Sequence, residues 1–213
     1  MTIIAEDEAI RIEKLVLSAY RTNTYIVVCQ KTRESVLIDA PAEAETILKA
    51  LQNTNPKYIL LTHNHMDHTG ALAELHSRLK VPLAAHVLDS VNLPVKPEML
   101  LNDGDTLSVG ELRLKVFHTP GHTPGSLCFS VGCYLISGDT LFTGGPGRTR
   151  RPADLKQITD SITSRILVLP DDTLIYPGHG ESTLLKKERE EIRVFSSRPH
   201  NPDLCGDIVW LTS

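Results

Sequence analysis

Cysteine is scarce in this sequence and shows no paired arrangement. The 213 residues include 4 cysteines, Cys29, Cys128, Cys133 and Cys205, and no two of them form a Cys-x-x-Cys motif. Closely spaced cysteines are typical of thiolate zinc sites, and a cysteine framework is typical of small secreted domains. The pattern therefore predicts neither structure, and we expect reduced thiols that are mostly packed in the interior.

Long apolar runs and basic clusters are also missing. No apolar stretch approaches the roughly 18 to 20 residues that a membrane-spanning helix needs. The segment Met1 to Glu8 is acidic, whereas a signal peptide begins basic and then turns apolar. The formal net charge is −4, and no run of lysine and arginine stands apart from acidic neighbours. This argues against a nucleic-acid partner, so we expect a cytoplasmic protein that acts on small molecules.

The remaining composition fits a globular enzyme. Hydrophobic residues make up 41% of the chain, enough to bury a full core, and no stretch has the composition of a linker. We therefore expect a single domain over residues 1–213. Strand-like runs are followed by a helix-like pattern twice along the chain. Two such halves, stacked with their helices outside, predict an α/β fold of the four-layer αβ/βα sandwich type.

Alternating and helically spaced apolar residues predict the order of the elements. The first half is expected to hold strands over residues 10–17, 24–29, 35–39 and 58–61, and helices over 41–50 and from Gly70 onward. The second half is expected to hold strands over 81–86, 106–109, 111–117, 126–131, 134–136 and 173–176, and helices over 155–167 and 182–195. Asp154 and Ser182 are expected to cap the last two helices. Residues 89–99 and 199–213 have little pattern.

A dense group of metal-ligand residues follows the strand expected at 58–61. The run Thr62-His63-Asn64-His65-Met66-Asp67-His68 contains three imidazoles and a carboxylate. Ligands at this spacing cannot share one helix face, but a strand end that turns into a loop can direct them into one cavity. Imidazole and carboxylate without thiolate favour a catalytic site for zinc, iron or manganese over a closed structural site.

Three further candidate ligands each follow a glycine near the end of a later strand. They are His122 after Gly121, Asp139 after Gly138 and His179 after Gly178. Glycine permits tight turns and close backbone approach, which a crowded metal centre requires. Seven ligands can hold two divalent ions, with zinc as the first expectation and iron or manganese as alternatives. One ion would take His63, His65 and His122, the other Asp67, His68 and His179, and Asp139 would bridge them.

These motifs resemble a known family. In their order along the chain, His63-x-His65-x-Asp67-His68, Gly121-His122-Thr123, Gly138-Asp139-Thr140 and Gly178-His179-Gly180 closely resemble the metallo-β-lactamase superfamily. The resemblance spans most of the chain. It implies the αβ/βα sandwich and the same metal assignment, and it identifies Asp67 and Asp39 as catalytic carboxylates, with Asp39 acting through a ligand that it orients. The runs 119–125, 138–142 and 147–149 are most similar to short single-domain members of the glyoxalase II (hydroxyacylglutathione hydrolase) branch.

The resemblance implies hydrolysis of a thioester. Metal coordination lowers the pKa of a bridging water toward neutrality, so the resulting hydroxide can attack an acyl carbon without a serine or cysteine nucleophile. A lactone or another ester is the next substrate class. The rival hypothesis is a persulfide dioxygenase, which shares the fold and uses one iron held by two histidines and one carboxylate, matching His63, His122 and Asp139.

Two features differ from the glyoxalase II pattern. Full-length members bind glutathione partly through a C-terminal helical domain, whereas this chain ends at Ser213, soon after His179. Related sequences usually have aspartate after Gly-Arg-Thr, whereas Arg150 and Arg151 follow Thr149 here. Together with Arg148, these cations are candidates to bind an anionic substrate. A solvated loop without substrate contacts is the alternative.

Overall fold

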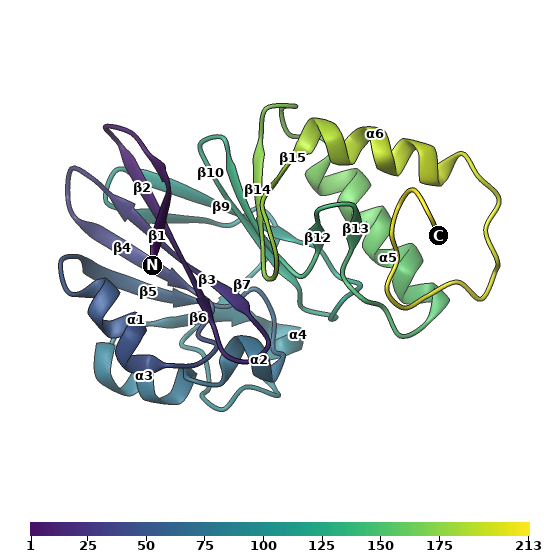
Figure 1. The fold of residues 1–213 in the computed structure, drawn as a ribbon. Helices are drawn as coiled ribbons and strands as arrows, with labels where there is room; N and C mark the ends of the chain where they lie inside the picture. Colours follow the sequence, from purple (N-terminus) through teal and green to yellow (C-terminus); the bar gives the residue numbers. More distant parts are fainter.

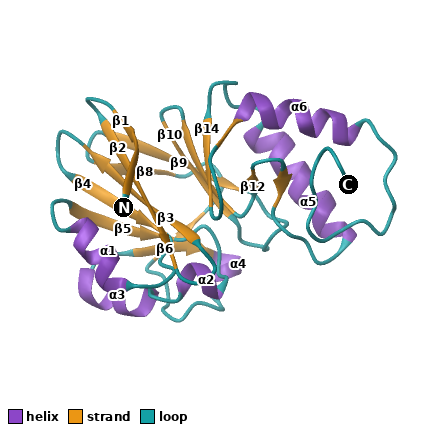
Figure 2. Ribbon diagram, in the orientation of Figure 1, coloured by secondary structure: helices purple, strands orange, loops and turns teal.

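The computed structural model describes residues 1–213 and contains two facing β-sheets with helices on both outer surfaces (Figure 1; Figure 2). The first sheet runs in sequence order from β1 to β7. Its first four strands are antiparallel neighbours, and β4 to β7 are parallel. The strands are β1 (Thr2–Glu6), β2 (Ile10–Leu17), β3 (Thr22–Cys29), β4 (Glu34–Ile38), β5 (Asn55–Leu60), β6 (Leu83–His86) and β7 (Met99–Leu101).

The second sheet has six strands in the order β15-β14-β11-β10-β9-β8. Only β11 and β14 pair in parallel. The strands are β8 (Thr106–Val109), β9 (Leu112–His118), β10 (Leu127–Val131), β11 (Tyr134–Gly138), β14 (Leu174–Pro177) and β15 (Thr183–Leu184). A separate small hairpin is formed by β12 (Leu141–Phe142) and β13 (Gly145–Pro146).

Alternation along the strands builds the core between the sheets. Ile10 and Ile12 of β2 face the second sheet, whereas Leu15 and Leu17 face outward toward helices. Opposite them, Val116 and Phe129 close the inner layer from the second sheet. Because side chains alternate between faces, each sheet presents an apolar surface on both sides and needs a cover on each.

Helices provide the outer covers. On the first sheet, α1 (Ala44–Leu51) and α3 (Leu72–Leu79) bury their apolar faces. On the second sheet, α5 (Pro152–Ser161), the π-helical turn Ile162–Ile166 and α6 (Leu185–Ser196) do the same. Two short helices, α2 (Met66–Thr69) and α4 (Val87–Ser90), follow β5 and β6. The predicted four-layer α/β sandwich is therefore confirmed, and none of these helices has the length and hydrophobicity that crossing a membrane requires.

The segment after α6 docks on the second half through an aromatic anchor. Trp210 is fully buried, and its ring centroid lies 5.1 Å from that of Phe195. The backbone N–H of Trp210 donates to the carbonyl oxygen of Gly144, 2.8 Å away, in the turn between β12 and β13. A stretch without sequence periodicity is thus held in place by contacts with distant residues.

Several local predictions were wrong. The strands β1 and β7 were not predicted. Residues 91–98 form no helix or strand, as expected for the segment 89–99, and only its ends belong to α4 and β7. Pro152 begins α5, so Arg151 and not Asp154 occupies the N-cap position. Ser182 caps no helix, because β15 intervenes before α6 begins.

The cysteine prediction was correct in part. All four thiols are free, as expected, and Cys29 and Cys128 are buried. Cys133 is exposed and Cys205 is half-buried. The expectation of mostly packed thiols therefore holds only for Cys29 and Cys128.

Candidate metal centre

All seven predicted ligands lie where strands of the two sheets end. His63 and His65 follow β5, with Asp67 and His68 on the short helix α2. From the second sheet, His122 follows β9, Asp139 follows β11 and His179 follows β14. Strand ends from two stacked sheets thus supply one cluster, and no single element contributes all of it.

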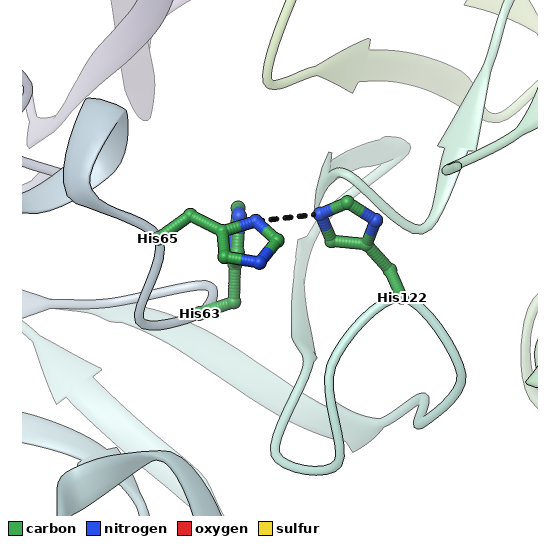
Figure 3. A group of neighbouring side chains, drawn as sticks. All are labelled: His63, His65 and His122. Carbon is green, nitrogen blue, oxygen red and sulfur yellow. Dashed lines mark hydrogen bonds between the residues drawn. The ribbon is translucent and has the colours of Figure 1, made fainter. Parts of the chain in front are cut away.

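The first group consists of His63, His65 and His122, whose ligand atoms lie within 4.8 Å of one another (Figure 3). His65 Nδ1 lies 3.0 Å from His122 Nε2. His63 is only 2% exposed, and its Nε2 is buried without a hydrogen-bond partner. Three imidazoles thus direct nitrogen atoms at one point.

The second group consists of Asp67, His68 and His179, within the same 4.8 Å limit. His179 Nε2 lies 3.1 Å from Asp67 Oδ2 and 3.3 Å from His68 Nε2. This group has one carboxylate, whereas the first has none.

Asp139 lies between the two groups. Its Oδ1 is 3.4 Å from His68 Nε2, and its Oδ2 is 3.5 Å from His122 Nε2 and 3.7 Å from His179 Nε2. Oδ1 is buried and accepts no hydrogen bond. The carboxylate therefore faces both groups, in the position that a bridging ligand needs.

Four of the five imidazoles are held by an oxygen atom at Nδ1. The partners are Thr62 Oγ1 for His63 (3.0 Å), Asp39 Oδ2 for His68 (2.8 Å), the Arg148 carbonyl for His122 (2.9 Å) and the Tyr20 carbonyl for His179 (3.2 Å). A carbonyl oxygen can only accept, so Nδ1–H donates in His122 and His179, and Nε2 is left with a free lone pair toward the cluster.

Asp39 supports both groups from behind. Its Oδ1 accepts the backbone N–H of Thr62 (2.8 Å), and its Oδ2 accepts the Thr62 hydroxyl (2.8 Å). Oδ2 also contacts His68, and Thr62 in turn contacts His63. One carboxylate at the end of β4 therefore fixes one imidazole directly and a second one through Thr62.

The pKa values of several side chains in the cluster are shifted from their ordinary values. Burial, reinforced by repulsion from His68, lowers the pKa of His63 well below its ordinary value. Burial also opposes the charged form of His68, but attraction to Asp39 and contacts with Asp139 outweigh it and raise the pKa to about 10. The neighbouring imidazole of His179 lowers the pKa of Asp67 to about 2. A divalent cation in this cluster would balance the negative charge of the carboxylates and accept the lone pairs of the imidazoles.

The residues present fit divalent metal ions. The donor set is nitrogen and carboxylate oxygen, which zinc, iron and manganese accept. His63 Nε2 and Asp139 Oδ1 are buried and have no hydrogen-bond partner, and both atoms face the centre of the ligand cluster, where an ion would bind. A Cβ on Gly178 would overlap Asp139 Oδ1 and lie 2.7 Å from His68 Cε1, so glycine is required for the ligands to approach this closely.

A cavity of about 330 Å³ opens beside His122, Asp139 and His179. Its other walls are the hairpin between β12 and β13, Arg148, and the C-terminal residues 207–209. Figure 1 shows the chain end passing close to this hairpin. The tail therefore forms part of the wall that a substrate would meet.

The three predicted arginines differ in their engagement. Arg151 is tied to Asp154 through Nη2 at 2.6 Å, and Arg148 lies 3.7 Å from Asp207. Arg150 forms no ion pair and lines two cavities, each with His65 and His122. All three side chains are exposed, and only Arg150 combines a free guanidinium with a place beside the histidines.

Sequence reasoning missed Thr62 and Asp89 as partners of the ligand loops. Thr62 could have been suspected because it directly precedes His63 at the strand end. Asp89 gave no signal, since it is a single carboxylate in a segment without pattern. His86 and His118 stack on each other at 3.9 Å between centroids and belong to neither ligand group.

Comparison with known families decides the classification. A family model, the metallo-beta-lactamase superfamily, matches residues 18–179. The chain belongs to the metallo-β-lactamase superfamily. It is thus a metallohydrolase of this superfamily with a candidate histidine and aspartate metal site.

Relatives within the metallo-β-lactamase superfamily include proteins named for glyoxalase II activity. Hydroxyacylglutathione hydrolase GloC of Haemophilus influenzae is 29% identical, and the match covers 88% of this chain and 99% of that protein. An uncharacterized protein of Aquifex aeolicus is 35% identical, with 78% and 88% covered. The probable hydroxyacylglutathione hydrolase glo2 of Schizosaccharomyces pombe is 33% identical over 73% of this chain, which spans only 62% of that longer protein.

Solved structures of the superfamily agree on the fold. BLEG-1, a B3 metallo-beta-lactamase, has a TM-score of 0.78 at 30% identity, covering 84% of this chain and 96% of that one. ETHE1 from Myxococcus xanthus has a TM-score of 0.75 at 30% identity, with 84% and 81% covered. TTHA1623, solved in a di-iron-bound form, has a TM-score of 0.73 at 35% identity, with 83% and 96% covered.

Proposed function

We propose that this chain hydrolyses acyl thioesters of the hydroxyacylglutathione type, using two divalent metal ions. The observation that carries the proposal is the convergence of five histidines and two aspartates, with His63 Nε2 and Asp139 Oδ1 buried and unpartnered. The relatives named hydroxyacylglutathione hydrolase support the substrate class.

The ligands divide between two ions in this proposal. His63, His65 and His122 would hold one ion, Asp67, His68 and His179 would hold the other, and Asp139 would be shared between them. Bound divalent ions supply Lewis acidity, which lowers the pKa of water and polarises an acyl carbonyl. We take zinc as the first candidate, with iron or manganese as alternatives.

The chain's own groups prepare this chemistry. The Arg148 and Tyr20 carbonyls fix the tautomers of His122 and His179, so that each presents an unprotonated Nε2. Asp39 orients His68, and Asp67 is a catalytic carboxylate as well as a ligand. Because these ligands are already held in place, no protein group has to reorganise at the moment of reaction.

Substrate recognition falls to the cavity walls. The tail residues 207–209 and the β12–β13 hairpin border the space beside Asp139. Arg150, which is free of carboxylate partners, lines two other cavities with His65 and His122 and would attract an anionic group of the substrate there, with Arg148 and Arg151 adding positive potential. Lactones or other esters could enter the same space, because an open metal site does not require a sulfur leaving group.

An iron-dependent persulfide dioxygenase is the second candidate function. His122 Nε2 lies 3.5 Å from Asp139 Oδ2, and with His63 they form the two histidines and one carboxylate that suit non-haem iron. In that case the residues of the second group would be present without a catalytic ion.

Metal analysis and two activity assays separate these functions. We expect about two equivalents of metal in freshly purified protein, cleavage of S-lactoylglutathione, and no oxygen uptake with glutathione persulfide. One equivalent of iron with oxygen uptake would instead assign the dioxygenase. Asp139→Ala should abolish hydrolysis, whereas full activity of that variant would exclude the bridging role.

A further inference from the structure

Asp89 is a buried carboxylate that contacts both loops of the first ligand group. It lies on α4 and is 1% exposed. Its Oδ2 accepts the backbone N–H of Asn64 (3.1 Å) and the hydroxyl of Thr123 (2.7 Å), and its Oδ1 accepts the backbone N–H of Gly125 (2.8 Å). Asn64 stands between His63 and His65, and Thr123 follows His122. The carboxylate thus joins two loops from different sheets.

The residues around Asp89 are tightly packed. A Cβ on Gly125 would lie 2.6 Å from Asp89 Cγ, so only glycine lets the loop approach the carboxylate this closely. The backbone carbonyl of Asp89 also accepts from Asn64 Nδ2 at 3.3 Å. A buried carboxylate that receives several such bonds is strongly localised, because leaving any of these donors unpaired carries a desolvation cost.

The two loops joined by Asp89 present nitrogens that must meet at a fixed distance. His65 Nδ1 and His122 Nε2 are 3.0 Å apart, and they come from opposite sheets. Of the residues on these loops, Asp89 contacts Asn64, Thr123 and Gly125, each one to three positions from a ligand. Asp39 bonds directly to His68 of the second group, and it reaches the first group only at His63, through Thr62.

We propose that Asp89 is the positioning residue of the group His63, His65 and His122. By bonding to both loops it sets the separation of His65 from His122, and it therefore controls metal affinity at that group and not at the second one. The inference rests on the proposed metal centre and adds to it a second buried carboxylate, which acts on the first group alone.

Asp89→Asn tests this most sharply. The amide keeps the size of the carboxylate but turns one acceptor oxygen into an NH₂ group that faces a donor. The substitution is made in two backgrounds: His179→Ala, which disables the second group, and His65→Ala, which disables the first. Zn²⁺ affinity is measured by competition with a chromogenic chelator, and Co²⁺ absorption spectra are recorded. We expect affinity to fall about 10- to 100-fold in the His179→Ala background and to stay unchanged in the His65→Ala background.

Glu188→Gln is the matched control. Glu188 is also fully buried and accepts a backbone N–H, from Gly144 (2.9 Å), and a threonine hydroxyl, from Thr183 (2.7 Å), but neither partner is within three positions of a ligand. It should lower the thermal midpoint without altering Zn²⁺ affinity. If Asp89→Asn does not fold, Thr123→Val removes one of the three donors at little cost in volume and should weaken Zn²⁺ binding in the same selective way.

The outcomes separate this inference from the proposed function. Wild-type protein that binds two ions, with Asp89→Asn affecting neither group or both groups equally, overturns the role of Asp89 alone. Wild-type protein that binds no metal overturns the proposed function and this inference with it. If Glu188→Gln lowers Zn²⁺ affinity as much as Asp89→Asn does, the loss is explained by general destabilisation, and the inference is overturned.

Discussion

Asp39 Oδ2 lies 2.8 Å from Nδ1 of His68, and both side chains are buried. The backbone of Asp39 has a φ of 64°, in the left-handed region that asparagine and aspartate occupy more readily than other non-glycine residues. The backbone of Asp39 is strained, and this conformation brings the carboxylate to Nδ1 of His68, the ring nitrogen that faces away from the other ligands.

Asp39→Asn should weaken metal binding without adding backbone strain. The amide tolerates the same φ, but the negative charge behind His68 is lost, so we expect about 10- to 100-fold lower Zn²⁺ affinity. Chelator competition measures this directly. Asp39→Ala removes the same charge and adds strain, so its thermal midpoint should be lower still. If the Asp39→Asn variant binds Zn²⁺ with wild-type affinity, the charge of Asp39 does not contribute to metal binding.

Gly178→Ala and Gly180→Ala should change different properties of the protein. A methyl group at Gly178 overlaps Asp139 and crowds His68, so metal stoichiometry should drop. At Gly180 a methyl group meets nothing within 4 Å, and only the positive φ of 72° is penalised. That variant should lose about 1 to 2 kcal/mol of unfolding free energy and keep its metal. Elemental analysis beside urea denaturation distinguishes them, and intact metal binding in Gly178→Ala would contradict the packing argument.

Arg150→Ala should raise the KM for an anionic acyl thioester and leave kcat unchanged. Its guanidinium has no carboxylate partner, so loss of one exposed charge contact of about 1 kcal/mol predicts a KM roughly five times higher. Arg151→Ala is the comparison, because Arg151 is already bound to Asp154. Steady-state kinetics at low and high salt give the result, and the difference between the variants should shrink as salt increases. Equal KM values for both variants at low salt would exclude a specific role for Arg150.

Trp210→Ala should destabilise the protein by about 3 to 5 kcal/mol, since it removes a fully buried indole. Trp210→Phe should cost much less, because it preserves aromatic packing against Phe195 and removes an indole N–H that has no partner. Chemical denaturation provides both values. A loss in Trp210→Ala below 1 kcal/mol would mean that the tail is not anchored by this ring.

The sequence alone was sufficient for the overall fold and for the gathering of the ligands. His122, Asp139 and His179 each follow a glycine after an apolar strand, and strands of stacked sheets end at one edge, so their proximity follows from local pattern plus topology. Whether each binds a metal is a separate question that stays a prediction.

Features that depend on distant partners could not be predicted. The burial of Trp210 is set by Phe195 and Gly144, neither of which is near it in sequence. Asp89 acquires its role only when two loops from different sheets approach it. At α5 a local rule was applied to the wrong residue: Asp154 is a good cap, but Pro152 begins the helix three residues earlier than predicted.

Trp210 is the single tryptophan of the chain, and it is buried next to the tail residues that wall the cavity. Intrinsic emission excited at tryptophan wavelengths therefore comes from one ring at a known place. A shift of that emission to longer wavelength marks release of the tail into water, whereas global unfolding also removes the far-ultraviolet circular dichroism. The protein thus carries its own optical probe of whether a compound entering the cavity displaces the tail, and no attached dye is needed.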